Sequence, residues 1–139
     1  MCLRVNKAFP TKKDAQNYKG EIATKDIKVY KVLEYGTSGK SNKDRAYSPY
    51  RGFYYDKGTQ YTESKLNRRY YTTGWSHQCS LTIEKGLHAY VKKNCRQIKN
   101  HLSTYAHAKP VVIEMIIPKG SIYYLGDNND IVTNNLIWY

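Results

Sequence analysis

The segment that most constrains the fold of this chain is residues 111–117, whose sequence VVIEMII is the most apolar in the protein. Pro110 and Pro118 bound it, and proline interrupts both helices and central strands. A short, nearly continuous apolar run of this kind is typical of a strand that is covered on both faces. We therefore expect residues 111–117 to be the central strand of a sheet.

An amphipathic helix is expected ahead of this strand. Apolar side chains in residues 91–102 recur at intervals of four, three and four positions, which places them on one face of a helix. These residues are Val91, Cys95, Ile98 and Leu102. The other face of the expected helix is basic and carries Lys92, Lys93, Arg96 and Lys99.

The remaining strand signals are short and are separated by polar segments. β-Branched and aromatic residues indicate strands at 27–33, 53–55, 60–62, 121–125 and 131–138, and Asp56-Lys57-Gly58 indicates a hairpin turn. Together they predict an α+β fold: a small, mostly antiparallel β-sheet with one main amphipathic helix and long polar loops. We expect residues 1–24 to be a polar N-terminal extension and residues 25–139 to be a single α+β domain, which suits a chain of 139 residues.

The charge of the chain is strongly positive. It contains 23 lysines and arginines against 11 aspartates and glutamates, a formal net charge of +12. Such a balance attracts polyanions and phosphorylated ligands, although a lysine-rich solvated surface gives the same count. Basic and aromatic residues are also interleaved, as on surfaces that bind single-stranded nucleic acid, or as tyrosines that lie on a sheet beneath a solvated loop. These residues are Arg45, Tyr47, Tyr50 and Arg51, and the run Arg68-Arg69-Tyr70-Tyr71.

Cysteine use and hydropathy indicate the compartment. Three cysteines, Cys2, Cys79 and Cys95, are too few and too widely spaced for a disulfide framework, which favours a reducing environment. Residues 1–25 contain no apolar run as long as that of a signal peptide, and no segment has the roughly 20 apolar residues of a membrane span. We therefore expect a cytoplasmic protein with no membrane association.

Several short motifs occur in a characteristic order. They are IKVYKV (27–32), RGFYY (51–55), KGTQY (57–61), EKGLHAY (84–90), PKG (118–120) and DIVTNNL (130–136). This set resembles a family of small uncharacterised domains found in bacteria, phages and mobile elements, some of which precede pentapeptide repeats. The family carries no established activity. The resemblance implies an accessory or regulatory protein, located in the host cytoplasm if it is encoded by a phage.

The order of the later segments is also similar to the ADP-ribosyltransferase fold. In that fold a Gly-Ile-Tyr-Phe-Ala-like turn leads into a helix and a buried strand, and a later strand carries a catalytic glutamate. Here residues 86–90, 91–102 and 111–117 follow the same order. The resemblance implies a cleft for NAD lined by Tyr30, Tyr90 and Asp130. Asp130 replaces the glutamate, and no His-Gly pair is present to grip nicotinamide near Tyr30, so the scaffold is implied more than the activity.

The candidate binding site centres on His88. It follows Gly86 in a turn that we expect at the head of the helix, where free backbone N–H groups attract anions. Together with His88 and Gly86, the residues expected to bind a phosphate, a nucleotide or a nucleic acid are Arg51, Tyr50, Lys92 and Arg96. The alternative is a half-buried histidine that hydrogen-bonds a backbone carbonyl and holds the turn.

Other groups of reactive residues have no recognisable spacing. His77, Cys79, Cys95, His101 and His107 offer zinc-binding chemistry but match no common zinc pattern, so we expect no metal site and a buried thiol at Cys95. No cysteine–histidine pair has a recognisable third group to orient it for nucleophilic catalysis. The sequence GDNND at 126–130 lacks the spacing and final glutamate of a calcium loop and is expected to be a hairpin loop.

These observations favour a non-enzymatic protein that binds an anionic ligand, either nucleotide-like or nucleic acid, without a cofactor. Two alternatives remain open. One is an ADP-ribosyltransferase-like enzyme or a degenerate relative of one, and the other is a protein–protein interaction module that acts on a host factor.

Overall fold

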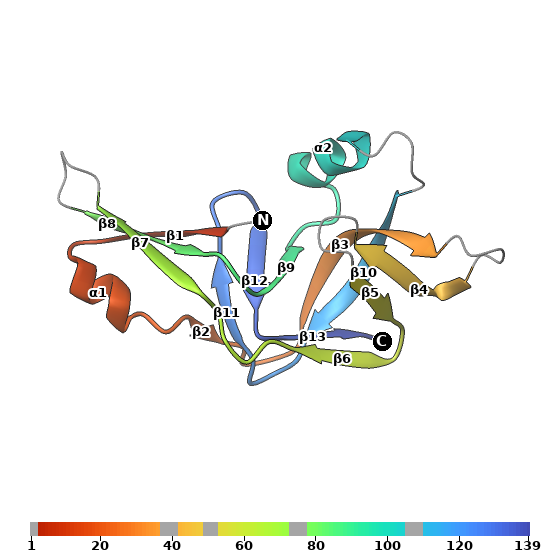
Figure 1. The fold of residues 1–139 in the computed structure, drawn as a ribbon, viewed down its shortest axis with the longest axis horizontal. Helices are drawn as coiled ribbons and strands as arrows, with labels where there is room; N and C mark the ends of the chain where they lie inside the picture. Colours follow the sequence, from red (N-terminus) through yellow and green to blue (C-terminus); the bar gives the residue numbers. More distant parts are fainter. Residues whose placement is uncertain (1–2, 37–41, 49–52, 73–77, 105–109) are drawn as a thin grey trace.

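The computed structural model describes residues 3–36, 42–48, 53–72, 78–104 and 110–139. No helix in this part of the chain is long and apolar enough to cross a membrane. The described residues form thirteen strands and two short helices (Figure 1). In chain order these are β1 (Leu3–Phe9), α1 (Lys12–Asn17), β2 (Glu21–Ile22), β3 (Ile27–Gly36), β4 (Asn42–Ser48), β5 (Phe53–Asp56), β6 (Thr59–Thr62), β7 (Arg68–Thr72), β8 (Cys79–Ile83), β9 (Leu87–Tyr90), α2 (Arg96–Thr104), β10 (Pro110–Ile117), β11 (Ile122–Leu125), β12 (Asp130–Thr133) and β13 (Asn135–Trp138).

The predicted α+β class is wrong, because the described part of the chain is essentially all-β. The expected main helix is reduced to α2, which has nine residues and begins only at Arg96. The residues before it form β9, which pairs with β12 and β3, and an irregular segment. Val91 and Cys95 still pack against apolar clusters, but without a helical backbone. Pairing across the sheet has therefore overridden the helical spacing of these residues.

The strands β3 and β10 form the centre of a ten-stranded sheet. They pair antiparallel in a continuous register, from Pro110 opposite Glu34 to Ile117 opposite Ile27. The sheet has the order β2-β11-β12-β9-β3-β10-β13-β6, and β4 also pairs with the C-terminal end of β3 and with β5. The apolar run at 111–117 is thus flanked by β3 and β13, and the prediction of a central strand is confirmed.

The predicted hairpin around Asp56-Lys57-Gly58 is wrong. The turn and both flanking strands are present, but β5 pairs with β4 and β6 pairs with β13. The turn therefore connects β5 and β6 at a corner without pairing them, and each strand pairs with a different neighbour. The rings of Tyr55 and Tyr61 pack across this corner with their centroids 4.9 Å apart. The local turn sequence determines where the chain changes direction, whereas residues distant in the sequence determine which strands β5 and β6 pair with.

A second, three-stranded sheet has the order β1-β8-β7. Its inner face buries Leu3 and Leu81 against Ala15 of α1 and against Tyr124 and Val132 of the larger sheet. Residues 3–22, within the segment that we expected to be an extension, form β1 of this sheet, α1, and β2 of the larger sheet.

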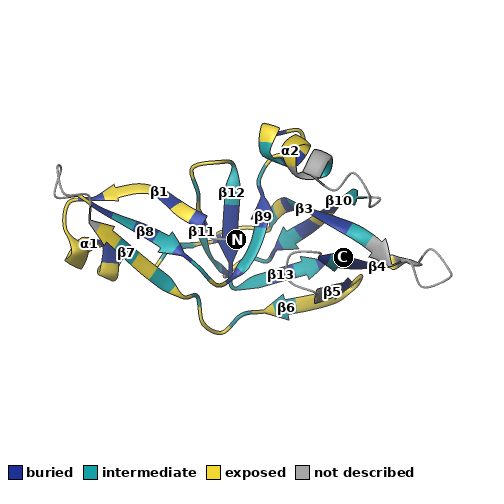
Figure 2. Cartoon of the chain, turned by 45° about the horizontal axis from the view of Figure 1, so that its top comes forward, coloured by how far each residue is buried: buried dark blue, intermediate teal, exposed yellow. Residues whose placement is uncertain are grey.

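The larger sheet is covered on both faces. Val29 and Leu33 of β3 point into a core shared with Met115 and Trp138 on one face. Val32 points to the opposite face, where α2 packs through residues that include Ile98. Figure 2 shows buried residues along β3, β9 and β12, whereas α1 and β6 are largely exposed. The helix α2 thus rests on the sheet by one side and presents its other side to solvent.

Candidate nucleic-acid interface

The segment from β9 to the end of α2 carries a concentrated positive charge. No acidic residue occurs between Glu84 and Glu114 in the sequence. The cations Lys92, Lys93, Arg96 and Lys99 are all exposed. The described residues form five ion pairs with one another, and none of them includes any of these four side chains. We call these four residues the α2 cations.

The α2 segment is held in place by contacts on two sides. Cys95 and Ile98 are buried with Val32 of β3 beneath the helix. On the side of the β11–β12 loop, the Val91 N–H donates to the Asn129 carbonyl over 2.8 Å, and Asn129 Nδ2 donates to Gln97 Oε1 over 3.3 Å. The α2 cations are therefore displayed on a backbone that is attached to the sheet, which lowers the entropy lost when they bind a ligand.

An exposed aromatic and basic stack lies on β4 and β5. Tyr47 is directly opposite Tyr54, and their ring centroids are 4.9 Å apart. The Arg45 guanidinium carbon lies 4.4 Å from the centroid of the Tyr54 ring, and Arg45 Nε lies 3.3 Å from Asp56 Oδ1. Tyr54 keeps 45% of its surface exposed. We call Arg45, Tyr54 and Tyr47 the β4–β5 stack.

The α2 cations and the β4–β5 stack lie on the same face of the larger sheet. Val32 points toward α2, and Glu34, two residues further along β3, points to the same face because side chains alternate along a strand. Glu34 is directly opposite Tyr47, which is directly opposite Tyr54. In Figure 1, α2 lies above β9 and β3, and β4 and β5 lie lower and to the right. The α2 cations and the β4–β5 stack, which are distant in the sequence, thus lie over the same face of the larger sheet.

The structure places His88 differently from the sequence-based prediction. His88 lies in β9 opposite Val132, not in a turn at the head of a helix, and α2 begins at Arg96. The backbone of β9 pairs with neighbouring strands, and Lys31 Nζ donates a hydrogen bond to the His88 carbonyl oxygen. Of the other predicted ligands, Lys92 and Arg96 are among the α2 cations, whereas Tyr50 and Arg51 lie outside the described residues.

Gly86 has a packing role in the structure. A β-carbon at this position would come too close to Val132 Cγ2 and would lie 2.8 Å from Leu66 Cδ2. Glycine is thus required because the backbone passes directly over other side chains, and not because it leaves N–H groups open to an anion.

Replacing Gly86 with alanine is expected to lower the stability of the protein by roughly 1–3 kcal/mol, the usual cost of overpacking a core. Affinity for nucleic acid should change less than about twofold, because the α2 cations are elsewhere. Urea unfolding of Gly86→Ala gives the first quantity and oligonucleotide titration gives the second. A large loss of affinity in a fully folded variant would instead return Gly86 to the binding site.

The three residues implied by the transferase resemblance are aligned, and the middle one is buried. Asp130 is directly opposite Tyr90, and Tyr90 is directly opposite Tyr30, so they form one row across β12, β9 and β3. Tyr90 is buried in the cluster with Cys95 and Ile98. Asp130 Oδ1 accepts a hydrogen bond from the Asn128 N–H over 3.2 Å within the β11–β12 loop. Tyr90 therefore contributes to the packing of α2, and Asp130 closes the β11–β12 loop. Residues 126–130 form a hairpin loop, as expected.

Burial raises the pKa of the Asp130 carboxyl above its usual value near 3.8, and the charge of Asp127 raises it further, against the lowering by backbone hydrogen bonds. The ionised form is thus penalised in the folded state. The stabilising contribution of Asp130 is fully present below pH 3.8 and is lost as the pH rises through the raised pKa.

We expect Asp130→Asn to increase the melting temperature by roughly 1–3 °C at pH 7, because Asn128 keeps its acceptor while the buried charge is removed. The gain should shrink as the pH falls through the raised pKa and disappear near pH 3.8. Melting curves of both proteins from pH 3.5 to 7.5 test this. A gain that does not depend on pH would show that charge is not its cause.

The run Arg68-Arg69-Tyr70-Tyr71 does not form one surface. It lies in β7, so alternate side chains point to opposite faces. Tyr70 packs against the inner cluster, and Arg68 Nη1 donates to the Tyr18 carbonyl over 2.8 Å. On the outer face Arg69 Nε pairs with Glu84 Oε1 at 2.8 Å. Both cations therefore have partners within the protein, and the four side chains are divided between the two faces of β7.

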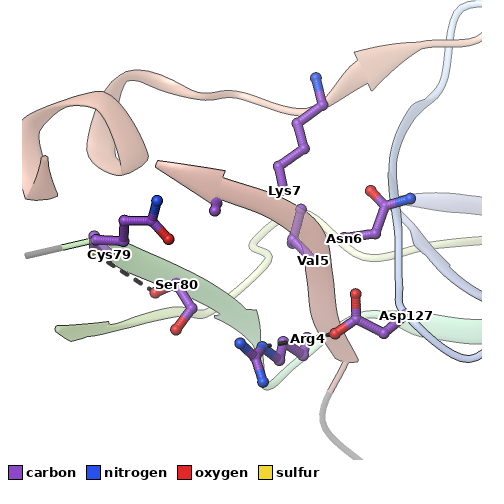
Figure 3. Close-up of a pocket in the computed structure, with 9 residues that line it drawn as sticks. Arg4, Val5, Asn6, Lys7, Cys79, Ser80 and Asp127 are labelled. Carbon is purple, nitrogen blue, oxygen red and sulfur yellow. Dashed lines mark hydrogen bonds and ion pairs between the residues drawn. The ribbon is translucent and has the colours of Figure 1, made fainter. Parts of the chain in front are cut away.

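A pocket that the sequence did not indicate lies where β1 is bulged (Figure 3). It has a volume of about 240 Å³. Its lining comes from β1, the start of β8 and the β11–β12 loop, with Arg4 Nε 3.6 Å from Asp127 Oδ2 at one end. The Cys79 thiol donates to the Ser80 carbonyl and is buried. Arg4 is paired with Asp127, and Lys7, which also lines the pocket, is paired with Glu21 at 3.2 Å, so both cations of the pocket are neutralised within the protein, unlike the α2 cations.

Cys79 and Cys95 are both free and buried, and the buried thiol predicted at Cys95 is confirmed. The described residues contain no group of three or more histidine, cysteine, aspartate or glutamate side chains that could hold a metal ion. His77 and His107 lie outside the described residues.

Sequence reasoning missed Tyr54 as a site residue and left Lys93 and Lys99 outside the predicted ligand set. Lys93 and Lys99 could have been found from the absence of acidic residues between Glu84 and Glu114. Tyr54 could not have been found from the sequence, because its contacts with Arg45 and Tyr47 depend on the pairing of β4 with β5.

Comparison of the chain with models of protein families, with curated proteins and with solved structures finds no match. Any function must therefore be argued from the surfaces described above.

Proposed function

We propose that this protein binds nucleic acid through the α2 cations, as a binding protein rather than an enzyme. The observation that carries the proposal is the group of four exposed cations on one docked segment, with no ion pair to any described residue. A polynucleotide supplies the matching regular row of negative charges. Each phosphate contact releases counterions, and this release is the main driving force of sequence-independent binding.

The arrangement of the cations favours a backbone-binding mode. Lysines at 92, 93 and 99 are point charges, and Arg96 adds a planar donor that can hold two phosphate oxygens. A helix of nine residues is about 14 Å long, and the cations occupy both the helix and the irregular segment before it. Such a stretch can contact several successive phosphates without reading the bases, so the expected affinity is moderate and depends strongly on salt.

Titration of a fluorescent 15-nucleotide oligo(dT) with the protein, read by fluorescence anisotropy, tests the proposal. If all four α2 cations contact phosphates, the logarithm of the binding constant should fall with the logarithm of salt concentration with a slope near −3. Heparin should compete, since it offers the same charge. Absence of any anisotropy change at about 20 mM salt would overturn the proposal, because counterion release is then at its strongest.

A further inference from the structure

We propose that the β4–β5 stack binds an unpaired base and so gives the protein a preference for single-stranded over double-stranded nucleic acid. This inference rests on the proposed function, because the α2 cations would hold the phosphate backbone of the same strand. The β4–β5 stack adds a surface that can contact the flat face of a base, which the α2 cations do not provide.

The β4–β5 stack offers an exposed ring and an exposed guanidinium to a base. The rings of Tyr47 and Tyr54 are in contact at an interplanar angle of 45°, and the Arg45 guanidinium carbon lies 4.4 Å from the centroid of the Tyr54 ring. Half of the Arg45 side-chain surface remains exposed, as does 45% of Tyr54. Bases stack on aromatic rings and on guanidinium planes, so the exposed parts of Tyr54 and Arg45 can each contact the face of a base.

The Arg45 side chain is restrained before any ligand arrives. Asp56, directly opposite Arg45 on the neighbouring strand, lies 3.3 Å from its Nε atom. An arginine restrained by a carboxylate and a ring loses less conformational freedom on binding than a free one. Because Asp56 also neutralises its charge, Arg45 is better suited to stacking than to phosphate binding.

Selectivity for single strands follows from the access that a base needs. In a duplex, both faces of every internal base are covered by neighbouring base pairs, so the β4–β5 stack can contact only ends. In an unpaired strand the base faces are free to leave one another and stack on the protein. The α2 cations can contact either form, and the preference must therefore come from the stack.

A cross-strand aromatic pair also stabilises a sheet without any ligand, and the two roles predict different mutant behaviour. Tyr54→Leu keeps an apolar side chain and removes the ring, whereas Tyr54→Phe keeps the ring. Arg45→Lys keeps the charge and removes the planar guanidinium. Circular dichroism and melting temperature confirm that each variant is folded before binding is measured.

The experiment compares three probes of 15 nucleotides: oligo(dT), a duplex, and a strand of the same phosphates with abasic sugars. Wild-type protein should bind oligo(dT) at least about tenfold more tightly than the other two. Tyr54→Leu should weaken oligo(dT) binding by roughly 5- to 100-fold, Arg45→Lys should weaken it in the same direction, and Tyr54→Phe should stay within about twofold. Neither Tyr54→Leu nor Arg45→Lys should change the affinity for the abasic strand.

The outcomes separate this inference from the function on which it rests. If wild-type protein binds none of the three probes, both are overturned. If it binds oligo(dT) and the duplex equally well, or if folded Tyr54→Leu and Arg45→Lys bind oligo(dT) as wild type does, the role of the stack is overturned and the role of the α2 cations stands. Loss of affinity for the abasic strand in Tyr54→Leu would show a disturbed fold rather than a lost base contact, and would also overturn it.

Discussion

Reversing the charge of all four α2 cations, in the variant K92E/K93E/R96E/K99E, should lower the affinity for oligo(dT) by roughly 10²- to 10⁴-fold at about 50 mM salt. The change removes four attractions to phosphate and introduces four repulsions. The fold should persist, because all four side chains are exposed and none of them forms an ion pair with a described residue. Glutamate at position 96 also suits the positive end of the helix dipole.

A matched control separates a local site from the overall charge of the protein. The variant K12E/K13E/K57E/K65E reverses four other exposed lysines and changes the net charge by the same amount. We expect it to lose less than about tenfold in affinity, because it acts only through the long-range field. Equal losses in the two variants would show that net charge alone drives binding and that α2 is not a site. Anisotropy at several salt concentrations also gives the slope, which should flatten only in the α2 variant.

Trp138→Ala should have the largest effect on stability, a loss of about 3–5 kcal/mol. Trp138 is the second-last residue of the chain, yet only 5% of its surface is exposed, and it belongs to the core cluster that contains Val29, Leu33 and Met115. Its carbonyl oxygen also accepts a hydrogen bond from the Gly58 N–H at the corner between β5 and β6. Domains are commonly stable by only about 5–15 kcal/mol, so this variant should be close to unfolding at 37 °C.

The neighbouring residue provides the comparison. Tyr139 is 51% exposed and donates a hydrogen bond to Glu114 Oε2 over 2.7 Å at the surface. Tyr139→Ala should cost about 0.5 kcal/mol or less, as is usual at exposed positions. Urea denaturation of both variants measures the difference. Similar stabilities would mean that the last strand is not part of the core.

The central strand could be predicted because its signal is local and strong. Residues 111–117 combine an apolar run with a proline at each end, and few structures other than a central strand satisfy both. The structure extends the strand by one residue, to Pro110–Ile117. The predicted helix failed because its signal was only the spacing of four apolar residues. The same spacing also allows burial in successive elements of different kinds. Val91 directly follows β9, Cys95 lies in the irregular segment, and Ile98 and Leu102 lie in α2.

The candidate site was predicted in part for a similar reason. Lys92 and Arg96 were identified because they lie on the basic face of the helix that was expected to follow the His88 turn. His88 and Gly86 were chosen for a turn that the structure replaces with β9 and tight packing. The run Arg68-Arg69-Tyr70-Tyr71 was divided between two faces of β7, since alternation in a strand separates neighbours in sequence.

The sequence by itself determined the excess of positive charge, the acid-free stretch between Glu84 and Glu114, and the most apolar strand, because composition and local order suffice for each. Only the tertiary structure decided which strands pair, and pairing decided the all-β class. It also placed Arg45, Tyr47 and Tyr54 beside one another and on the same face as the α2 cations. Such placements depend on contacts between residues far apart in the chain, and a local pattern carries no information about the register that brings them together.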